Sequence, residues 1–376
     1  MNLHRSILYE GYDKKTCFVH ARLAAHNAFL LVTAQKMDVA GSDCFFGLQT
    51  NLSFDGGASW TGFSPDPVFE SYMSDGLRCV CCDMTPMYHK KTGRFLVTGH
   101  IAQYEPDSIF PVKPIKNTRI TPYAVFDEKT QRFGPVRAVG MPDPVKYCDC
   151  GSGCSQCFEL PDGDILIPIS FREKKDGVSL NAKAAVMRCS FDGETLCVKE
   201  IGSDIEVPDE VRGIGECSVI CHEGRFFLTI RGDTYGYVSV SDDGLRYTQP
   251  SVWKWDTGCI VPTYNTQSHW MHQDGKLFLV YTRRDGKNDH VFRNRAPLYA
   301  AQADADTLTL LRNTEAAVVP ERGARLGNFG VCSPDDTLSY VIAAEWMQPA
   351  GCERYGSDNA VWLVDIRSDS GKEPCR

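Results

Sequence analysis

The sequence predicts an all-β protein, a six-bladed β-propeller, because one hairpin pattern recurs along its 376 residues. The clearest copy spans residues 216–231, where a strand runs to a turn at Glu223-Gly224 and an apolar strand returns. Five similar hairpins span residues 20–36, 83–100, 156–172, 269–284 and 328–345. Successive copies lie roughly 50 to 70 residues apart, which is typical of propeller blades.

The two ends of the chain are expected to close the ring. Residues 1–15 contain one apolar piece, Ile7-Leu-Tyr, and the last unit is cut short at Val361-Trp-Leu-Val. We expect residues 6–10 to pair with this last strand, which removes an open sheet edge. Helical patterns are scarce and no linker is apparent, so residues 1–376 are predicted to form a single propeller domain.

The composition narrows the class of protein. The formal net charge is −8 and Lys and Arg form no block, which argues against a nucleic-acid partner. No apolar run is long enough to cross a bilayer, so we expect no membrane partner, and the start of the chain lacks the apolar core of a secretory signal. The sequence has 17 cysteines, which we therefore expect to be reduced thiols in a cytoplasmic protein.

One dense run of cysteines comprises Cys148, Cys150, Cys154 and Cys157. Closely spaced thiolates are preferred zinc ligands, so this run could hold a metal. The alternative is a Cys-rich loop that enters the third blade, since a second spaced CxxC or a His pair is missing. We predict no metal and no other cofactor.

A second signature follows the first hairpin. Residues 53–60 read Ser-Phe-Asp-Gly-Gly-Ala-Ser-Trp, and residues 241–247 hold a weaker copy. In such a turn Ser53 and Asp55 bond backbone amides, while Gly57 supplies a permissive φ. This pattern is the Asp-box, or BNR repeat, and through it the sequence resembles the sialidase (neuraminidase) superfamily. The resemblance implies a propeller that hydrolyses glycosides and takes a glycan or small glycoside as its substrate.

Hairpin geometry indicates where a site would lie. The start of each first strand and the end of each second strand share one face, so six hairpins gather their ends around one central depression, where pockets usually form. Charged and polar residues at these ends are the candidate substrate-binding set: Arg22, Asp83, His100, Gln156, Arg231, His269 and Glu345. For each of them the alternative is a satisfied ion pair at the rim.

The resemblance assigns three arginines to a substrate carboxylate. Arg22 begins the first blade, Arg231 ends the hairpin of residues 216–231, and Arg295 stands in an Arg-x-x-Leu setting. Guanidinium groups suit this role because each can bond a carboxylate twice. Arg293 competes with Arg295, and either could instead be paired with Asp289.

The resemblance also implies catalytic carboxylates. Asp43 lies in the loop after the first hairpin, where the family has its general acid, and Asp38 is the alternative. The other interpretation of Asp43 is a loop carboxylate that caps backbone amides. Glu216 stands at the family's spacing before Arg231 and is the second catalytic candidate.

One departure from the family concerns its tyrosine nucleophile. The corresponding stretch here, residues 327–330, reads Gly-Asn-Phe-Gly, so Phe329 replaces a hydroxyl. Either another residue attacks, or water does so in an inverting reaction with Glu216, Asp83 or a histidine as base. The histidines near this face or in its hairpins are His20, His89, His100, His269, His272 and His290.

The sequence therefore predicts an exo-glycosidase with sialidase-like specificity, which acts on a terminal sugar. The three arginines indicate that this sugar is acidic. Two alternatives stay open. One is an exo-glycosidase or lyase for another sugar, such as a uronic acid or a rhamnose-containing end. The other is a non-catalytic glycan-binding propeller, because one fold hosts many functions.

Overall fold

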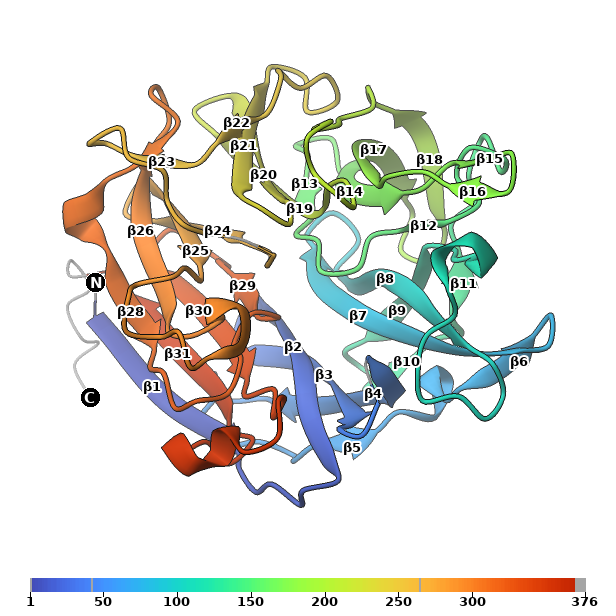
Figure 1. Ribbon diagram of the computed structural model, residues 1–376, viewed down its shortest axis with the longest axis horizontal. Helices are drawn as coiled ribbons and strands as arrows, with labels where there is room; N and C mark the ends of the chain where they lie inside the picture. Colours follow the sequence, from blue (N-terminus) through green and yellow to red (C-terminus); the bar gives the residue numbers. More distant parts are fainter. Residues whose placement is uncertain (1, 42, 264, 369–376) are drawn as a thin grey trace.

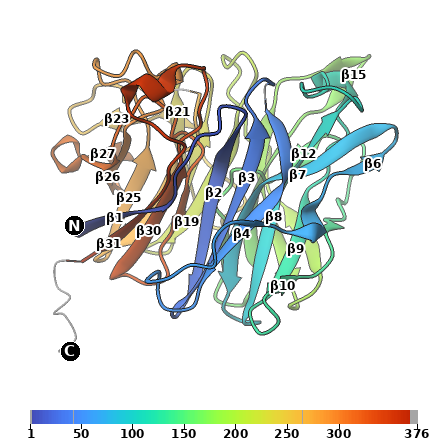
Figure 2. The ribbon, with the colours of Figure 1, turned by 90° about the horizontal axis from the view of Figure 1, so that it is seen from below.

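The computed structural model describes residues 2–41, 43–263 and 265–368, which fold as the predicted six-bladed β-propeller (Figure 1). The blades are small sheets that follow one another around a centre (Figure 1), and Figure 2 shows the same ring from the side. The described residues contain no helix long and apolar enough to span a bilayer. Helix is limited to short 3₁₀ turns, η1 (Pro67–Phe69), η2 (Pro114–Lys116), η3 (Phe292–Asn294), η4 (Arg312–Thr314) and η5 (Cys352–Tyr355).

The first three blades are built as follows. Blade one consists of β2 (Thr16–His26), β3 (Phe29–Asp38), β4 (Cys44–Ser53) and β5 (Ser64–Pro65). Blade two consists of β6 (Tyr72–Ser74), β7 (Leu77–His89), β8 (Arg94–Tyr104), β9 (Pro122–Asp127), β10 (Arg132–Phe133) and β11 (Arg137–Ala138). Blade three consists of β12 (Cys150–Gly151), β13 (Phe158–Glu159), β14 (Ile165–Phe171), β17 (Lys183–Phe191) and β18 (Leu196–Ile201), with a side hairpin β15 (Lys174–Lys175) and β16 (Val178–Ser179).

The last three blades complete the ring. Blade four consists of β19 (Gly215–His222), β20 (Arg225–Arg231), β21 (Gly236–Ser241) and β22 (Ser251–Val252). Blade five consists of β23 (Lys254–Trp255), β24 (His269–Gln273), β25 (Lys276–Tyr281), β26 (Leu298–Asp304), β27 (Thr309–Leu310) and β28 (Ala316–Val319). Blade six consists of β29 (Gly330–Cys332), β30 (Leu338–Ala344), β31 (Val361–Arg367) and β1 (Asn2–Tyr9).

The six predicted hairpins are confirmed as the inner strand pairs of the blades. They are β2–β3, β7–β8, β13–β14, β19–β20, β24–β25 and β29–β30, all antiparallel. The turns of the first five contain residues with positive φ, such as Asn27 at 53° and Gly224 at 78°. Such backbone conformations favour Gly and Asn, which is why the turns could be read from the sequence.

The predicted closure of the ring is also confirmed. Strand β1 pairs antiparallel with β31, from Asn2 opposite Arg367 to Tyr9 opposite Val361, a wider span than the expected residues 6–10. Arg5 extends this contact to blade five, because its Nε and Nη2 donate to the carbonyls of Val318 (2.7 Å) and Ala317 (2.8 Å). Strand β1 thus completes blade six and also links it to its neighbour.

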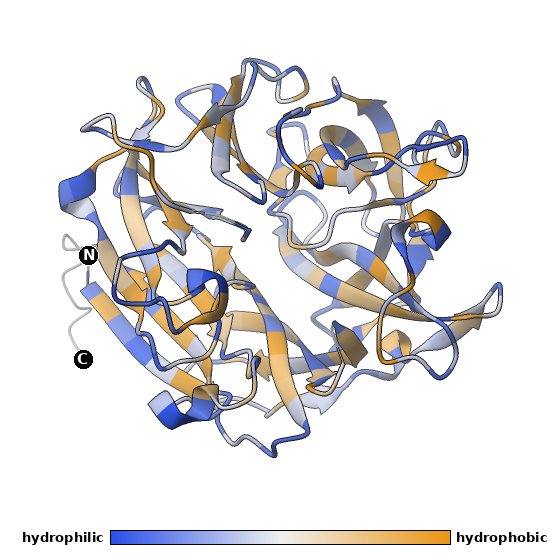
Figure 3. Cartoon of the chain, viewed as in Figure 1, coloured by the Kyte–Doolittle hydropathy of each residue, from blue (hydrophilic) through white to orange (hydrophobic). Residues whose placement is uncertain are grey.

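Apolar side chains fill the spaces between neighbouring blades. Between blades one and two, the Phe29 ring lies 5.4 Å from Phe95 and 5.9 Å from Phe126. Trp253 and Trp270 form a similar contact, 5.7 Å between ring centroids, next to blade four. Figure 3 shows the hydrophobic colour concentrated on the strands and the hydrophilic colour on the connecting loops. Since the core lies between blades, the ends of the inner strands can carry polar groups.

The turn over residues 53–60 is held by its own side chains. Gly57 N donates to Ser53 Oγ at 2.9 Å, and Ser59 N donates to Asp55 Oδ1 at 2.8 Å. Trp60 Nε1 donates back to the Gly57 carbonyl at 3.1 Å. The hydrogen bonds of Asp55, first those from Ser59, lower the pKa of its carboxyl to about 2. Ser241 and Asp243 form a similar turn in blade four.

Candidate functional site

A cavity of about 780 Å³ opens where the inner strands meet. Residues of all six blades line it, from His20 and Asp43 in the first to Arg325 and Trp346 in the last. This volume is within the range of small-molecule sites, about 300 to 1,000 Å³. The cavity is therefore the candidate site, on the face that the hairpin ends predict.

Backbone bulges aim three side chains at this cavity. Strands β2, β7 and β19 each hold one extra residue against their partner strand. Within these bulges His20, Asp83 and Glu216 have φ values of 54°, 51° and 47°. A non-glycine residue in this left-handed region costs of order 1 to 3 kcal/mol, and such strain clusters at functional sites. The bulges re-aim the side chains without breaking the hairpins.

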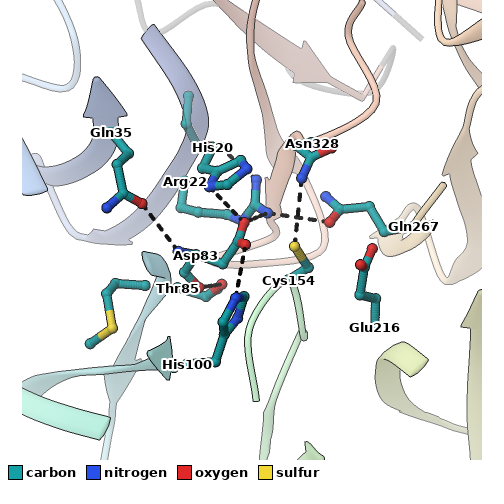
Figure 4. Close-up of polar contacts among 12 residues, drawn as sticks. His20, Arg22, Gln35, Asp83, Thr85, His100, Cys154, Glu216, Gln267 and Asn328 are labelled. Carbon is teal, nitrogen blue, oxygen red and sulfur yellow. Dashed lines mark hydrogen bonds and ion pairs between the residues drawn. The ribbon is translucent and has the colours of Figure 1, made fainter. Parts of the chain in front are cut away.

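Asp83 lies at the centre of a buried polar network (Figure 4). Its Oδ1 lies 3.0 Å from His20 Nδ1 and 3.4 Å from Arg22 Nη2, and its Oδ2 lies 3.8 Å from His100 Nε2. Burial works to raise the pKa of Asp83, but His20, His100 and Arg22 outweigh it and hold this pKa well below its usual range. Asp83 is therefore an anion at neutral pH.

Two glycines of the Cys-rich loop make room for His100. A Cβ at Gly153 would lie 1.7 Å from His100 Nδ1, and one at Gly151 would lie 2.5 Å from His100 Cβ. The imidazole lines the cavity with 21% of its side chain exposed. Burial lowers the pKa of His100, with Asp83 opposing this shift, so the ring is neutral at pH 7.

Arginines dominate the charge of the cavity wall. The lining contains six: Arg119, Arg212, Arg231, Arg293, Arg295 and Arg325. The lining carboxylates are Asp43, Asp83 and Glu216. Positive charge thus exceeds negative charge around the cavity, which favours an anionic ligand.

Three of these arginines are paired with carboxylates. Arg212 holds Asp233 with two bonds, at 2.7 and 2.5 Å. Arg119 bonds Asp149, and Arg231 Nη1 donates to Glu216. These three charges are compensated within the protein.

The other three arginines have neutral partners. Arg295 is 4% exposed and donates from Nη1 to Asn328 Oδ1 at 3.2 Å. Arg325 is 7% exposed and donates from Nη2 to Gln348 Oε1 at 2.9 Å. The guanidinium of Arg293 lies 5.0 Å above the Phe292 ring.

Burial and mutual repulsion lower the pKa values of Arg293, Arg295 and Arg325. Burial, followed by the charges of Arg231 and Arg325, holds the pKa of Arg295 well below its ordinary value. Burial lowers the pKa of Arg325 to about 10, although Asp43 opposes the shift. Burial, with Arg231 and Arg212, also lowers the pKa of Arg293. A nearby anion would relieve all three shifts.

Six of the residues expected at the site line the cavity. They are Asp43, Asp83, His100, Glu216, Arg231 and Arg295. Asp43 belongs to the loop before β4, and its carbonyl accepts a bond of 2.5 Å from Tyr104 Oη. Arg293, the competitor of Arg295, also lines the cavity, and Asp289 forms its ion pair with Arg284 at 2.6 Å.

Two other candidates lie behind the lining. Arg22 is 0% exposed and reaches Gln267 Oε1 at 3.3 Å as well as Asp83 (Figure 4). His269 is buried, with Nδ1 2.7 Å from Ser218 Oγ. Both belong to the layer that supports the cavity.

Gln156 and Glu345 hold strands and loops together. Gln156 bridges to the backbone of Trp270, donating to its carbonyl at 2.9 Å and accepting from its amide at 2.8 Å. Glu345 is buried and accepts from the amides of Asp358 and Ala360, each at 2.9 Å. Neither side chain is part of the cavity lining.

Phe329 also lies behind the cavity. Its ring is fully buried against His269, and its carbonyl accepts a 2.6 Å bond from Gln267 Nε2. The preceding residue, Asn328, reaches the cavity. Over residues 2–41, 43–263 and 265–368, no tyrosine lines it.

Some lining residues escaped the sequence argument because they do not stand at hairpin ends. Arg119 and Arg212 come from long connections within and between blades. Arg325 and Trp346 pair with each other as an isolated bridge before and after the last hairpin. The only sequence signal for them is their residue type, because irregular loops carry no period that predicts a face.

One group of potential metal ligands lies at the cavity. Among the residues described, the side-chain ligand atoms of Cys82, Asp83 and His100 lie within 4.8 Å of one another. Burial raises the pKa of the Cys82 thiol well above its ordinary value. Because Arg22 already contacts Asp83 and arginines line the cavity, the local charge opposes a divalent cation.

The run Cys148–Cys157 does not form such a group in the described ranges. Its sulfur atoms contact different neighbours: that of Cys150 accepts from Thr121 Oγ1, and that of Cys154 accepts from Asn328 Nδ2. The cysteines in these ranges are all free thiols.

Comparisons with known proteins place the fold. No protein-family model matches the sequence, and no curated protein matches it. A Dyadobacter fermentans protein of unknown function is similar in structure, with a TM-score of 0.67 at 13% identity over 97% of this chain and 99% of that one.

Two sialidases are similar as well. Trypanosoma rangeli sialidase in complex with sialic acid has a TM-score of 0.63 at 14% identity, over 98% of this chain and 59% of the sialidase. A mutant of NanB sialidase from Streptococcus pneumoniae has a TM-score of 0.62 at 10% identity, over 96% of this chain and 70% of that one. This chain thus corresponds to about 59% of the T. rangeli protein. The protein therefore has the six-bladed propeller fold that sialidases share.

Proposed function

We propose that the protein is an exo-glycosidase that hydrolyses a glycoside with an acidic terminal sugar. The observation that carries this proposal is the central cavity, where arginines outnumber carboxylates and several lack an anionic partner. Guanidinium groups in an enclosed site bind carboxylates strongly and with defined geometry. The similar T. rangeli sialidase, solved with sialic acid, is an example of this fold with an acidic sugar bound.

Asp43 is the proposed general acid. It lines the cavity on the loop before β4, and it is one of the charges that act on Arg325. Its proton passes to the glycosidic oxygen as the bond to the anomeric carbon breaks. The leaving group departs as a neutral alcohol.

His100 is the proposed base that activates water. Glu216 is bonded to Arg231, and Asp83 is bonded to Arg22, so neither is well placed to accept a proton. His100 is neutral and faces the cavity, while Asp83 behind it stabilises the imidazolium that forms. Water adds its oxygen to the anomeric carbon and gives one proton to His100, and this outcome inverts the configuration.

A panel of chromogenic glycosides tests the proposal. We expect turnover of sialosides or uronides and little turnover of the matching neutral glycosides. Asp43→Asn should lower kcat about 10²- to 10⁴-fold with little change in KM, because it removes a proton donor of similar shape. Asp38→Asn is the matched control, since Asp38 bonds the amide of Ala40. Equal turnover of neutral and acidic glycosides would refute the acidic substrate.

A glycan-binding protein without activity is the second candidate. It is favoured by the lining of the described residues, which includes no tyrosine at the place of the family's nucleophile. Calorimetry that shows binding of acidic sugars, together with an absence of turnover across the panel, would support this candidate. An unsaturated sugar product would instead indicate the lyase that the sequence left open.

A further inference from the structure

We infer that the cavity binds a glycan with at least two anionic groups, the second of which lies at Arg293 and Arg325 beside Phe292 and Trp346. This inference deepens the proposed function, on which it rests for the ligand being a glycan. A single acidic sugar carries one negative charge, whereas the arginines of the cavity offer more positive charge than one anion can neutralise.

The charge balance of the lining leads to this inference. Arg119, Arg212 and Arg231 have carboxylate partners. Asp83 is compensated by Arg22, whose Nη2 lies 3.4 Å from its Oδ1. Within the described ranges, the carboxylate left to offset the remaining arginines is Asp43.

Three arginines therefore face one carboxylate. In the described parts of the chain, Arg293, Arg295 and Arg325 form no ion pair, and their hydrogen bonds go to neutral groups. Even with Asp43 ionised, two positive charges remain, and one bound carboxylate would leave the site positive. Buried charge without a counter-charge is strongly unfavourable, so a second anion on the ligand is the natural complement.

Arg325 shows where the second anion would bind. Its guanidinium stacks on Trp346 at 4.0 Å and lies 5.1 Å from the Phe292 ring. Nη2 is bonded to Gln348, but the buried Nε has no hydrogen-bond partner. A buried N–H without a partner is unfavourable, and a hydrogen bond to a ligand oxygen would remove that cost. The contacts with Trp346 and Phe292 hold the guanidinium in place at the cavity wall.

The neighbouring surface can accept a ligand longer than one sugar. A second cavity of about 670 Å³ shares Phe292, Arg293 and Pro349 with the central one. The Phe292 ring is 43% exposed, and an exposed aromatic face can pack against a sugar ring. The second anion can thus be a substituent on the terminal sugar or an acidic group on the next one.

The ligand group is an oxyanion carried by a glycan. A guanidinium can bind the oxygens of a sulfate, a phosphate or a carboxylate, so any of the three could occupy the second site. Calorimetry should compare glucuronic acid, a sulfated glucuronic acid and a disaccharide of two uronic acids at equal ionic strength. Inorganic sulfate alone tests for a simple anion site. We expect the two dianionic sugars to bind at least ten times more tightly than glucuronic acid, and with a steeper dependence on salt.

Substitution of the second site should remove this preference. Arg325→Gln and Arg293→Gln should each weaken the binding of the two dianionic sugars several-fold more than they weaken the binding of glucuronic acid. Arg246→Gln is the matched control, because Arg246 is an exposed arginine paired with Glu200 outside the lining. Thermal denaturation without ligand should show that Arg325→Gln is folded and no less stable than the parent protein.

The outcomes separate this inference from the proposed function. Equal affinity for glucuronic acid and the dianionic sugars, or a preference that survives Arg325→Gln, overturns the inference even if acidic glycosides are hydrolysed. Inorganic sulfate that binds as tightly as the sugars also overturns it, since a simple anion site would then suffice. A dianion preference without hydrolysis upholds the inference and refutes the glycosidase.

Discussion

His100 shows how a single side chain depends on its surroundings. The glycines at positions 151 and 153 leave space for its ring, and Asp83 lies behind it. The cysteines of this loop raise the question of a zinc site. The structure instead gives a reason for its glycines, because any side chain at positions 151 and 153 would overlap His100. The absence of side chains at Gly151 and Gly153 thus determines where the His100 ring can lie.

Substitution of His100 should lower the rate of catalysis, and its titration should set the pH dependence of kcat/KM. His100→Gln should lower kcat about 10²- to 10⁴-fold, because glutamine cannot take a proton from water. In the parent protein kcat/KM should fall as pH drops through the pKa of His100, since the neutral ring is the proposed base. Burial lowers this pKa, so the fall should come below pH 6.5, the value of an ordinary histidine.

Gly153→Ala provides a second test of the same residue. Its Cβ would overlap His100 Nδ1, so the ring must move although its chemistry is intact. We expect a loss of kcat close to that of His100→Gln, with the fold preserved by circular dichroism. Gly140→Ala is the control, because a Cβ at Gly140 has open space around it. Full activity in Gly153→Ala would argue against His100 as the base.

The positions of the hairpin ends predicted the face of the propeller on which the cavity lies. They did not predict which side chains reach the cavity and which are buried behind it. Asp83, Glu216 and Arg231 reach the cavity, whereas His269 stands at an equivalent hairpin end and is buried. The difference comes from the one-residue bulges, which rotate Asp83 and Glu216 toward the centre. Bulges of this kind have no sequence signature here, because non-glycine residues occupy the positive φ positions.

At the level of elements, Glu345 links the last strands to the start of the chain. It directly follows β30 and accepts from the amides of Asp358 and Ala360, and the Asp358 carbonyl in turn accepts from Gly11 N at 2.8 Å. Trp362 Nε1 and Arg322 Nε add two further donors, at 3.2 and 3.1 Å. The sequence showed Glu345 as a hairpin end but could not show its partners, which come from distant segments.

The second prediction concerns this carboxylate. Glu345→Ala should lower the free energy of unfolding by about 3 kcal/mol, because four donors, two of them buried, lose their acceptor. Glu345→Gln keeps one carbonyl oxygen and should lose less. Denaturant titration measures both changes. A loss below about 1 kcal/mol for the alanine variant would show that the loop is held by other contacts.

At the level of the whole molecule, the six hairpins and the closing strand followed from the sequence because turns and apolar runs are local signals. The arrangement of strands within a blade follows from chain order, since neighbouring strands pair. The additional short strands, such as β6 and β23, had no comparable signal because they contain only two or three residues. The cavity wall was predicted in part, since loops supply Arg119, Arg212 and Arg325.

The third prediction concerns ring closure. Deletion of residues 1–9 should expose the edge of β31, lower the melting temperature and promote aggregation. Arg5→Ala should cost about 1 to 2 kcal/mol, because its two hydrogen bonds join blades five and six. His4→Ala on the same strand is the control, since the His4 side chain is 77% exposed. A deletion variant that melts like the parent would mean that β1 contributes little to closure.

Closure by β1 also constrains when the protein can finish folding. Strand β1 leaves the ribosome long before its partner β31, because the other strands of the ring lie between them in the sequence. At about 5 to 20 residues per second, synthesis of the 376 residues takes roughly 20 to 75 s. During that time β1 has no partner within its own chain, although it could pair with the β31 of a finished neighbour. Cells that translate this message on crowded polysomes therefore risk strand-exchanged dimers.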